Sequence, residues 1–489
     1  MEKSGAIRHL TMLAVCLAAA FALLLLCSQS SPLYPTNIWP DANCLLTVGR
    51  AMKEGAVLYR DIYEQKGPTL YLIHLFAAWI SDSSFFGVFI LEVLSLAAVL
   101  VMACRLFERR CAGFSAPALA ALAASLVLCG GAFMMGDSAE EFCLPYLMGA
   151  LCMAMDEYGG REGPMRPGRL FACGLLAGVV ATIKFTVLGL FVGLCIAEGV
   201  AALRAGGLRR AAQSAAAFLL GMLLPVGLWC LYFAVHGALS DCYTAYVHNN
   251  IFLYQGEARA FGDVLREIAR AVRDNLPAAA VGVVGLLALM TDSGEPLRLR
   301  LTVLCMAVGA GCAVFLPGRV FAYYPLALGV FVFAGMYGLL SAAARMRAMG
   351  ARCRRMLAPC ACALALLAAL LLSPNRPLRG VPRAELAQTR LAAYVHPGAT
   401  LLQYSHLDDG LYLAAGTLPQ DKYFVRLNVG YDEMLSELDR YLEEGRPDYV
   451  LVSWEELPDR FDRYQWIATD AGYDDQNRIN KLLHLYRRK

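Results

Sequence analysis

The chain has 489 residues, of which 58% are hydrophobic and only 17% are charged, whereas a soluble domain carries about a quarter charged residues. This composition excludes an ordinary soluble globular protein. The net charge is only +3, and the basic residues are scattered over several short loops, which argues against nucleic-acid binding.

The apolar residues come in blocks of roughly 15 to 22, a spacing that spans a hydrocarbon core of about 30 Å. The sequence therefore predicts an α-helical polytopic membrane protein with about eleven transmembrane helices, followed by a small extracytoplasmic α/β domain. The predicted spans are residues 10–28, 84–104, 113–133, 142–156, 169–183, 185–202, 212–234, 277–291, 299–316, 324–340 and 356–373.

The first apolar run has a basic flank that includes Lys3 and Arg8, a layout that signal peptides share. An uncleaved first span is favoured over a signal peptide, because the apolar run continues to Cys27 without a small-residue cleavage site to close it.

Short arginine-rich loops orient the predicted spans. The basic clusters lie at residues 105–110, 161–169, 204–210, 298–300 and 345–355. All of them fall on one side, which the positive-inside rule makes cytoplasmic. We expect a multi-pass protein of the cytoplasmic membrane with its N terminus inside and its C-terminal domain outside.

Two apolar segments decide the number of crossings and therefore which loops lie on which side of the membrane. Residues 69–80 would form a helix of only about 18 Å, so we expect them to lie in the interface or to re-enter rather than to cross. Residues 170–203 would be about 50 Å long as one helix, with Lys184 near the middle, where a charge costs about 2.5–3.5 kcal/mol or more. A hairpin with Lys184 at its outer turn resolves both problems.

On this topology polar segments face outward at residues 29–83, 136–141, 235–276 and 317–324, and they would converge above the helices. From about residue 380 the composition becomes charged and aromatic, with strand-like runs at 400–404 and 449–454 and a helical run at 431–444. We expect a transmembrane catalytic domain over 1–373 and the small outer domain over 380–489. Cys44 and Cys242 both fall in outer loops, where they could form a disulfide.

The first outer loop holds the strongest candidates for chemistry. Asp41 lies just beyond the first span, where a carboxylate could act as general base on an acceptor brought from outside. Lys66 precedes a Gly-Pro turn and could meet a lipid phosphate at headgroup depth. The alternative is structural: Asp41 caps a helix and Lys66 only extends to the interface.

The run from Asp41 through Tyr59-Arg60-Asp61 and Glu64-Gln65-Lys66-Gly67-Pro68 resembles the first external loop of bacterial family 39 glycosyltransferases of the GT-C superfamily. Protein O-mannosyltransferases and lipid A aminoarabinose transferases are relatives. Weaker similarity extends to residues 138–142 and 318–324. The resemblance implies that Asp41 is the catalytic base, that the donor is a sugar on a polyprenyl phosphate, and that Lys66 and Arg319 bind the phosphate.

The sequence also departs from these relatives. Asp41 is followed by Ala42, where mannosyltransferases have glutamate. Lys66 is followed by Gly67 and Pro68, where aminoarabinose transferases have two prolines. Neither the sugar nor the acceptor can therefore be inherited from either group.

The implied function is an inverting transfer of a monosaccharide to an acceptor glycan, lipid or protein at the outer face of the membrane. Further residues are candidates for the acceptor or sugar pocket: Tyr59, Arg60, Asp61, Glu140, Glu141, Asn249, Tyr323 and Tyr324. The adjacent carboxylates of Glu140 and Glu141 could also bind a divalent cation, or they could belong to a solvated turn. No other cofactor is expected.

A lipid or solute transporter or flippase is the rival function. Transporters typically have broken helices in matching halves and charges at mid-membrane depth. This sequence has few of either, although Glu92 lies inside the second predicted span. Its polar residues lie mainly in the outer loops, which favours an enzyme.

Overall fold

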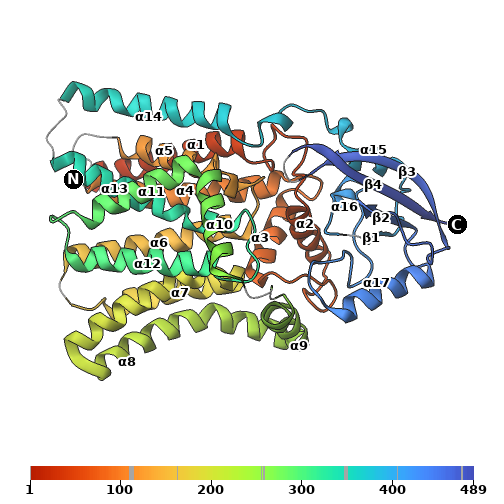
Figure 1. Ribbon diagram of the computed structural model, residues 1–489, viewed down its shortest axis with the longest axis horizontal. Helices are drawn as coiled ribbons and strands as arrows, with labels where there is room; N and C mark the ends of the chain where they lie inside the picture. The colour runs from red at the N-terminus through yellow and green to blue at the C-terminus, as the bar shows by residue number, and fades with distance from the viewer. Residues whose placement is uncertain are drawn as a thin grey trace.

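The structure is a computed structural model that describes residues 2–109, 115–161, 163–254, 256, 259–345, 351–404, 406–474 and 477–489. Most of the helices run side by side along one long axis, and a β-sheet lies beyond one end of them (Figure 1). The long helices are α1 (Glu2–Cys27), α4 (Phe86–Glu108), α5 (Ala116–Leu128), α6 (Ala139–Gly160), α7 (Pro167–Lys184), α8 (Gly189–Val235), α11 (Leu276–Met290), α12 (Leu297–Phe315), α13 (Val330–Arg345) and α14 (Ala351–Leu372).

Each of the predicted spans falls on one of these helices, with two of them on α8. Within the described residues, five helical segments are long and apolar enough to cross a membrane, or six if the bent pair α10 and α11 forms one span. One of the five is the 69-residue segment Pro167–Val235, which folds back on itself. Helices α5 and α11 are short for a full crossing, at 13 and 15 residues. The chain is a multi-pass membrane protein, and the number of eleven crossings stays a prediction.

The predicted hairpin at Lys184 is confirmed. Helix α7 ends at Lys184, and the 3-10 turn Phe185–Leu188 leads into α8. At the far end of this hairpin the amide of Met165 donates to Glu198 Oε2 at 2.9 Å. Helix α8 then reverses at Gly206–Gly207, where the backbone is not helical.

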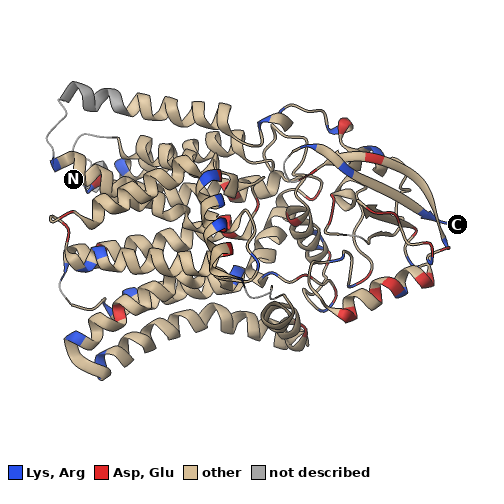
Figure 2. Cartoon of the chain, in the orientation of Figure 1, with Lys and Arg blue, Asp and Glu red and all other residues tan. Residues whose placement is uncertain are grey.

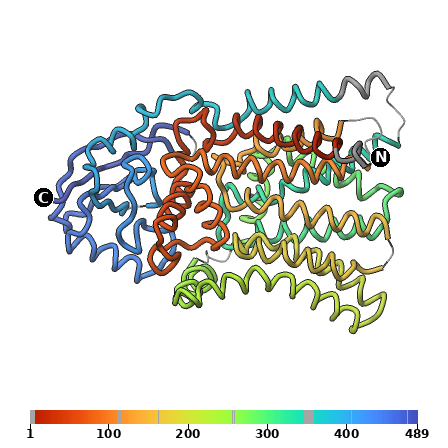
Figure 3. The backbone as a smooth tube through the Cα atoms, turned by 180° about the vertical axis from the view of Figure 1, so that it is seen from behind, coloured from red at the N-terminus to blue at the C-terminus, as the bar shows by residue number. Residues whose placement is uncertain are grey.

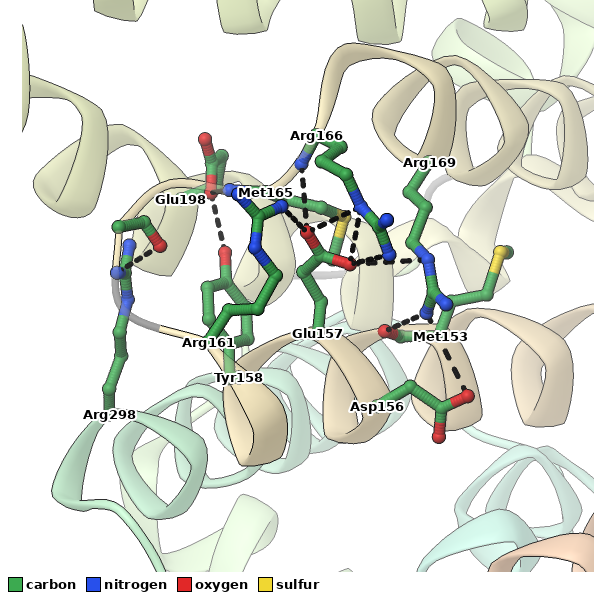
Figure 4. Close-up of polar contacts among 11 residues, drawn as sticks. Met153, Asp156, Glu157, Tyr158, Arg161, Met165, Arg166, Arg169, Glu198 and Arg298 are labelled. Carbon is green, nitrogen blue, oxygen red and sulfur yellow. Dashed lines mark hydrogen bonds and ion pairs between the residues drawn. The ribbon is translucent and has the colours of Figure 1, made fainter.

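The end of the bundle far from the sheet carries many of the basic side chains (Figure 2). There Glu157 of α6 is buried, accepts hydrogen bonds from Arg161 and Arg166, and forms an ion pair with Arg169 (Figure 4). Its oxygens lie 2.9 Å from Arg161 Nη1, 2.9 Å from Arg166 Nη2 and 3.2 Å from Arg169 Nε. This cluster ties α6 to the start of α7.

The segment between α1 and α4 lies between the helices and the C-terminal region (Figure 3). It contains α2 (Pro40–Lys53) and α3 (Pro68–Ile80). Helix α3 has 13 residues, too few to cross a bilayer, as expected. The segment between α8 and α11 contains α9 (Leu239–Cys242), a π-helical stretch Tyr243–Leu253 and α10 (Phe261–Asp274), which meets α11 at 104°.

The C-terminal region has a four-stranded sheet in the order β1-β2-β4-β3. Strands β1 (Leu401–Gln403) and β2 (Tyr449–Ser453) are parallel, and β2, β4 (Ile479–Arg488) and β3 (Tyr464–Tyr473) pair antiparallel. Its helices are α15 (Ala387–Ala392), α16 (Leu411–Ala414) and α17 (Asp432–Glu444). The two predicted strands and the predicted helix are confirmed as β1, β2 and α17.

Buried contacts join this region to the first loop. The hydroxyl of Thr47 in α2 donates to Asp408 Oδ2 at 2.7 Å, and the amide of Asp408 donates to Cys44 Sγ at 3.3 Å. The thiols of Cys44 and Cys242 are both free, so the suggested disulfide between them is wrong.

Candidate functional site

Asp41 and Lys66 form an ion pair between the two helices of the first loop. Pro40 begins α2, so Asp41 stands in its first turn, where a carboxylate is favourable. Trp39 is the N-cap residue, so Asp41 does not have the capping role considered above. Lys66 Nζ lies 2.7 Å from Asp41 Oδ1, and the two side chains are only 14% and 17% exposed.

The loop that carries Lys66 is packed directly on the end of α7. The amide of Gly67 donates to the carbonyl oxygen of Ile183 at 3.0 Å. A Cβ atom at Gly67 would lie 2.2 Å from the carbonyl oxygen of Thr182, so only glycine fits this approach. Pro68 then starts α3, with its fixed φ suited to the first helical position.

Glu64 holds Lys66 from within the protein. It is fully buried, with Oε1 3.1 Å from Lys66 Nζ, and its Oε2 accepts from the amide of Lys66 at 2.9 Å. Burial acts to lower the pKa of Lys66, but the carboxylates of Asp41 and Glu64 raise it well above its usual value. Lys66 is therefore held as an ammonium. The hydroxyl of Tyr59 donates to the Lys66 carbonyl oxygen at 2.5 Å.

The Asp41–Lys66 pair faces a cavity of about 90 Å³ at the junction of the helices and the C-terminal region. Five stretches of the helical part and two residues of the C-terminal region form its wall. The lining residues are Asp41, Glu64, Gln65, Lys66, Ile183, Lys184, Phe185, Thr186, Tyr246, Asn250, Tyr254, Phe321, Tyr323, Tyr324, Leu407 and Asn428.

A second lysine lies in the same wall. Lys184 Nζ is 2.5 Å from Glu140 Oε1 and lies 3.9 Å from the ring centre of Tyr324 and 5.0 Å from that of Tyr323. A cation over aromatic faces at this range is attracted by the ring quadrupole. The α7–α8 turn therefore places the charge of Lys184 at the cavity, in addition to keeping that charge out of the membrane interior.

The predicted site residues divide between this cavity and its surroundings. Tyr323 and Tyr324 line the cavity. Arg319 lies beside it, donating from Nη1 to the Asn428 carbonyl oxygen at 2.7 Å, with its guanidinium 4.9 Å from the ring centre of Tyr254.

Four other predicted residues lie outside the cavity. Tyr59 is buried beneath Lys66. Arg60 and Asp61 form an ion pair on the surface at 2.8 Å. Asn249 is buried and donates to the Tyr63 hydroxyl at 2.7 Å, whereas its neighbour Asn250 reaches the cavity wall.

Glu140 and Glu141 are not brought together, because successive residues of a helix point about 100° apart. Glu140 pairs with Lys184, whereas Glu141 Oε2 accepts from the amide of Asp137 at 2.9 Å. The described residues include no group of three or more His, Cys, Asp or Glu side chains that could hold a metal ion. The arrangement therefore offers no support for a cation between these two carboxylates.

Glu141 instead joins a buried acidic cluster. The amide of Asp137 also donates to Glu92 Oε1 at 2.8 Å, and Ser28 Oγ donates to Glu92 Oε2 at 2.8 Å. His74 Nδ1 donates to a backbone carbonyl oxygen, and its Nε2 lies 2.8 Å from Asp137 Oδ1. Burial raises the pKa of Asp137, although the neighbouring imidazole of His74 opposes this rise.

Several cavity residues were not predicted from the sequence. Glu64 and Gln65 belong to the first-loop motif next to Lys66, and the sequence marks Lys184 only as a charge that a membrane span would not tolerate. Leu407 and Asn428 come from the C-terminal region, where the sequence has no catalytic pattern. Their place in the wall depends on how two distant parts of the chain pack.

No protein-family model matches the chain, and no curated protein matches it. Among solved structures it is similar to ArnT from Cupriavidus metallidurans bound to undecaprenyl phosphate, with a TM-score of 0.59 at 12% identity over 97% of both chains. It is similar to the same protein in its apo state, with a TM-score of 0.60 at 12% identity over 99% of this chain and 98% of that one.

ArnT is a family 83 member of the GT-C superfamily, so the family 39 assignment made from the first loop stays a prediction. At 12% identity the similarity establishes the architecture over nearly the whole chain. The chain thus has the fold found in ArnT.

Proposed function

We propose that this protein is a membrane glycosyltransferase that moves a monosaccharide from a polyprenyl-phosphate carrier to an acceptor. The observation that carries the proposal is the ion pair of Asp41 and Lys66, 2.7 Å apart at a cavity between the helices and the C-terminal region. The fold supports the donor class, because the ArnT structure with the same fold holds undecaprenyl phosphate.

In the proposed reaction Asp41 is the general base. It removes the proton from the acceptor as the acceptor oxygen or nitrogen attacks the anomeric carbon of the sugar, and the bond from that carbon to the phosphate oxygen breaks with inversion. Lys66 stabilises the phosphate as it leaves. Arg319 is close enough to the wall, through Asn428 and Tyr254, to serve as a second phosphate ligand.

The ion pair of Asp41 and Lys66 implies that the donor binds before Asp41 acts as the base. Lys66 Nζ donates a hydrogen bond to Asp41 Oδ1. A phosphate oxyanion competes for the same ammonium, because charge-assisted hydrogen bonds to phosphate are as strong as those to a carboxylate. Donor binding would then free Asp41 to accept a proton from the acceptor.

Residues 1–373 would form the catalytic membrane domain and residues 380–489 an extracytoplasmic domain that covers the cavity through Leu407 and Asn428. The basic loops at the opposite end would face the cytoplasm, together with the N terminus. Tyr323 and Tyr324 would contact the sugar or the acceptor.

The test is transfer of labelled sugar from a panel of polyprenyl-phosphate donors by purified protein in lipid. Asp41→Asn, which is nearly isosteric and removes the base, is expected to lower transfer at least about 100-fold. The matched control is Asp82→Asn, in the same loop, where the carboxylate is half exposed and pairs with Lys53 away from the cavity.

Equal transfer by wild type and Asp41→Asn would place the base elsewhere. No transfer from any donor, with donor movement across the bilayer instead, would favour the transporter or flippase.

A further inference from the structure

One side chain of the cavity wall has an unused hydrogen-bonding atom. Gln65 lines the cavity and is only 8% exposed. Its Oε1 atom is buried and has no hydrogen-bond partner in the part of the chain that the structure describes. A buried acceptor without a partner costs about 1–3 kcal/mol, so a ligand that donates a hydrogen bond there would recover a large fraction of that cost.

The position of Gln65 is fixed on both sides. Its own carbonyl oxygen accepts from Asn250 Nδ2 at 2.6 Å, and the next residue is Lys66, which Glu64 and Asp41 hold. Under the proposed function Lys66 binds the donor phosphate. The sugar is bonded directly to that phosphate, so its ring would lie within reach of Gln65.

The charges around the cavity indicate which kind of sugar substituent Gln65 contacts. The carboxylates of Asp41 and Glu64 both face Lys66, and Glu140 faces Lys184. An ammonium group on the sugar would therefore meet two lysine ammoniums, which is unfavourable, or would pair with the Asp41 carboxylate that the donor phosphate frees and so occupy the proposed base. A hydroxyl carries no charge and can donate to the Gln65 amide oxygen.

We propose that Gln65 is a specificity-determining residue that accepts a hydrogen bond from a hydroxyl of the transferred sugar, and that the site takes a neutral sugar in preference to an amino sugar. This inference rests on the proposed function, since it requires a polyprenyl-phosphate donor. It adds the class of sugar and the residue that selects it.

The experiment measures kcat/KM for full-length protein in lipid. The donors are a polyprenyl-phosphate-linked neutral sugar, its monodeoxy derivatives and the matching amino sugar. Wild type is expected to prefer the neutral sugar, and one monodeoxy donor should be transferred about tenfold more slowly, the size of one lost hydrogen bond. Gln65→Leu should slow the parent sugar about tenfold but should not slow that monodeoxy donor further, because the two changes remove the same contact.

Gln65→Glu, which has nearly the same shape, should shift preference toward the amino sugar by about tenfold relative to wild type. Gln420→Leu, at an exposed site of the C-terminal region outside the cavity wall, is the control. Binding of polyprenyl phosphate without sugar reports on folding, and it should be the same in wild type and both Gln65 variants.

The two possible failures are separable. Strong transfer by wild type that does not depend on any single hydroxyl, that favours the amino sugar, or that Gln65→Leu slows equally for all donors would overturn this inference alone. Absence of transfer from every donor would overturn the proposed function and this inference with it. If Gln65→Leu fails to bind polyprenyl phosphate, the wild-type donor series and Gln65→Glu still decide the question.

Discussion

Lys66 Nζ and Asp41 Oδ1 lie 2.7 Å apart although the two residues are 25 positions apart in the sequence. Helix α2 and the chain that follows it lie between them, so the pair forms only when the first loop is folded. The two carboxylates that contact Lys66 differ in exposure. Asp41 is partly exposed, whereas Glu64 is fully buried.

Lys66→Met should lower the free energy of unfolding by about 3–5 kcal/mol, because it leaves Glu64 buried without its cation. The double variant Glu64→Gln, Lys66→Met should recover part of this loss, since the uncompensated charge is gone. Thermal unfolding in detergent measures both. A double variant no more stable than Lys66→Met would show that the charge of Glu64 is not what destabilises the single variant.

Gly67→Ala should destabilise the protein by about 1–3 kcal/mol, the usual cost of overpacking, because its Cβ would lie 2.2 Å from the Thr182 carbonyl oxygen. Gly168→Ala is the matched control: it also adjoins a proline at a helix start, and a Cβ there meets nothing within 4 Å. The melting temperatures of the two variants should therefore move apart. Equal melting temperatures would mean that α7 shifts to accommodate the added methyl group without loss of stability.

Asp408 should make stability depend on pH in the acidic range. Burial raises the pKa of this carboxyl from 3.8 to about 6, although the hydrogen bond from Thr47 opposes the rise. At this group the folded protein thus binds more protons than the unfolded chain between these values, so the contribution of Asp408 to stability is most favourable below pH 4 and falls by about 3 kcal/mol as pH rises through 6.

The Asp408→Asn variant tests this sign. An amide does not titrate, so the part of the fall in melting temperature between pH 4 and 6 that Asp408 causes should disappear. A variant whose melting temperature follows the wild-type curve throughout would assign that pH dependence to other groups.

Glu157→Leu should lower stability by about 2 kcal/mol without lowering transfer per folded molecule. The change removes a buried carboxylate that three arginines share (Figure 4), and none of these residues lines the cavity. Asp156→Asn is the control, because Asp156 is about one-third exposed and such pairs contribute about 1 kcal/mol or less. Reduced transfer by folded Glu157→Leu protein would reveal coupling between the two ends of the bundle.

The helices were predictable because long apolar runs separated by arginines leave few other solutions in a bilayer. The same reasoning located the turn at Lys184, because the apolar run 170–203 is too long for one span and has this charge near its middle. Strand β3 was not predicted, because most of its residues are partly or fully exposed and the apolar alternation that marks a half-buried strand is weak there. The partner strand β4 was missed with it.

The candidate site was predictable only in part. Asp41 and Lys66 were singled out from their residue types and their place at the membrane surface. Their contact with each other was not predictable, because their separation along the chain does not report their distance in the folded loop. Gln65 and Asn428 are common polar residues, and only the packing of remote segments distinguishes them.

The wall of the cavity includes Leu407 and Asn428, which lie in the last fifth of the polypeptide. A ribosome makes the chain from its N terminus, so Asp41 and Lys66 are in place long before these two residues exist. During synthesis the pocket therefore stays open on one side until the final segment has folded over it. A chain stopped before residue 400 would keep its helices in the bilayer and both charged groups of the first loop, but it would lack this cover.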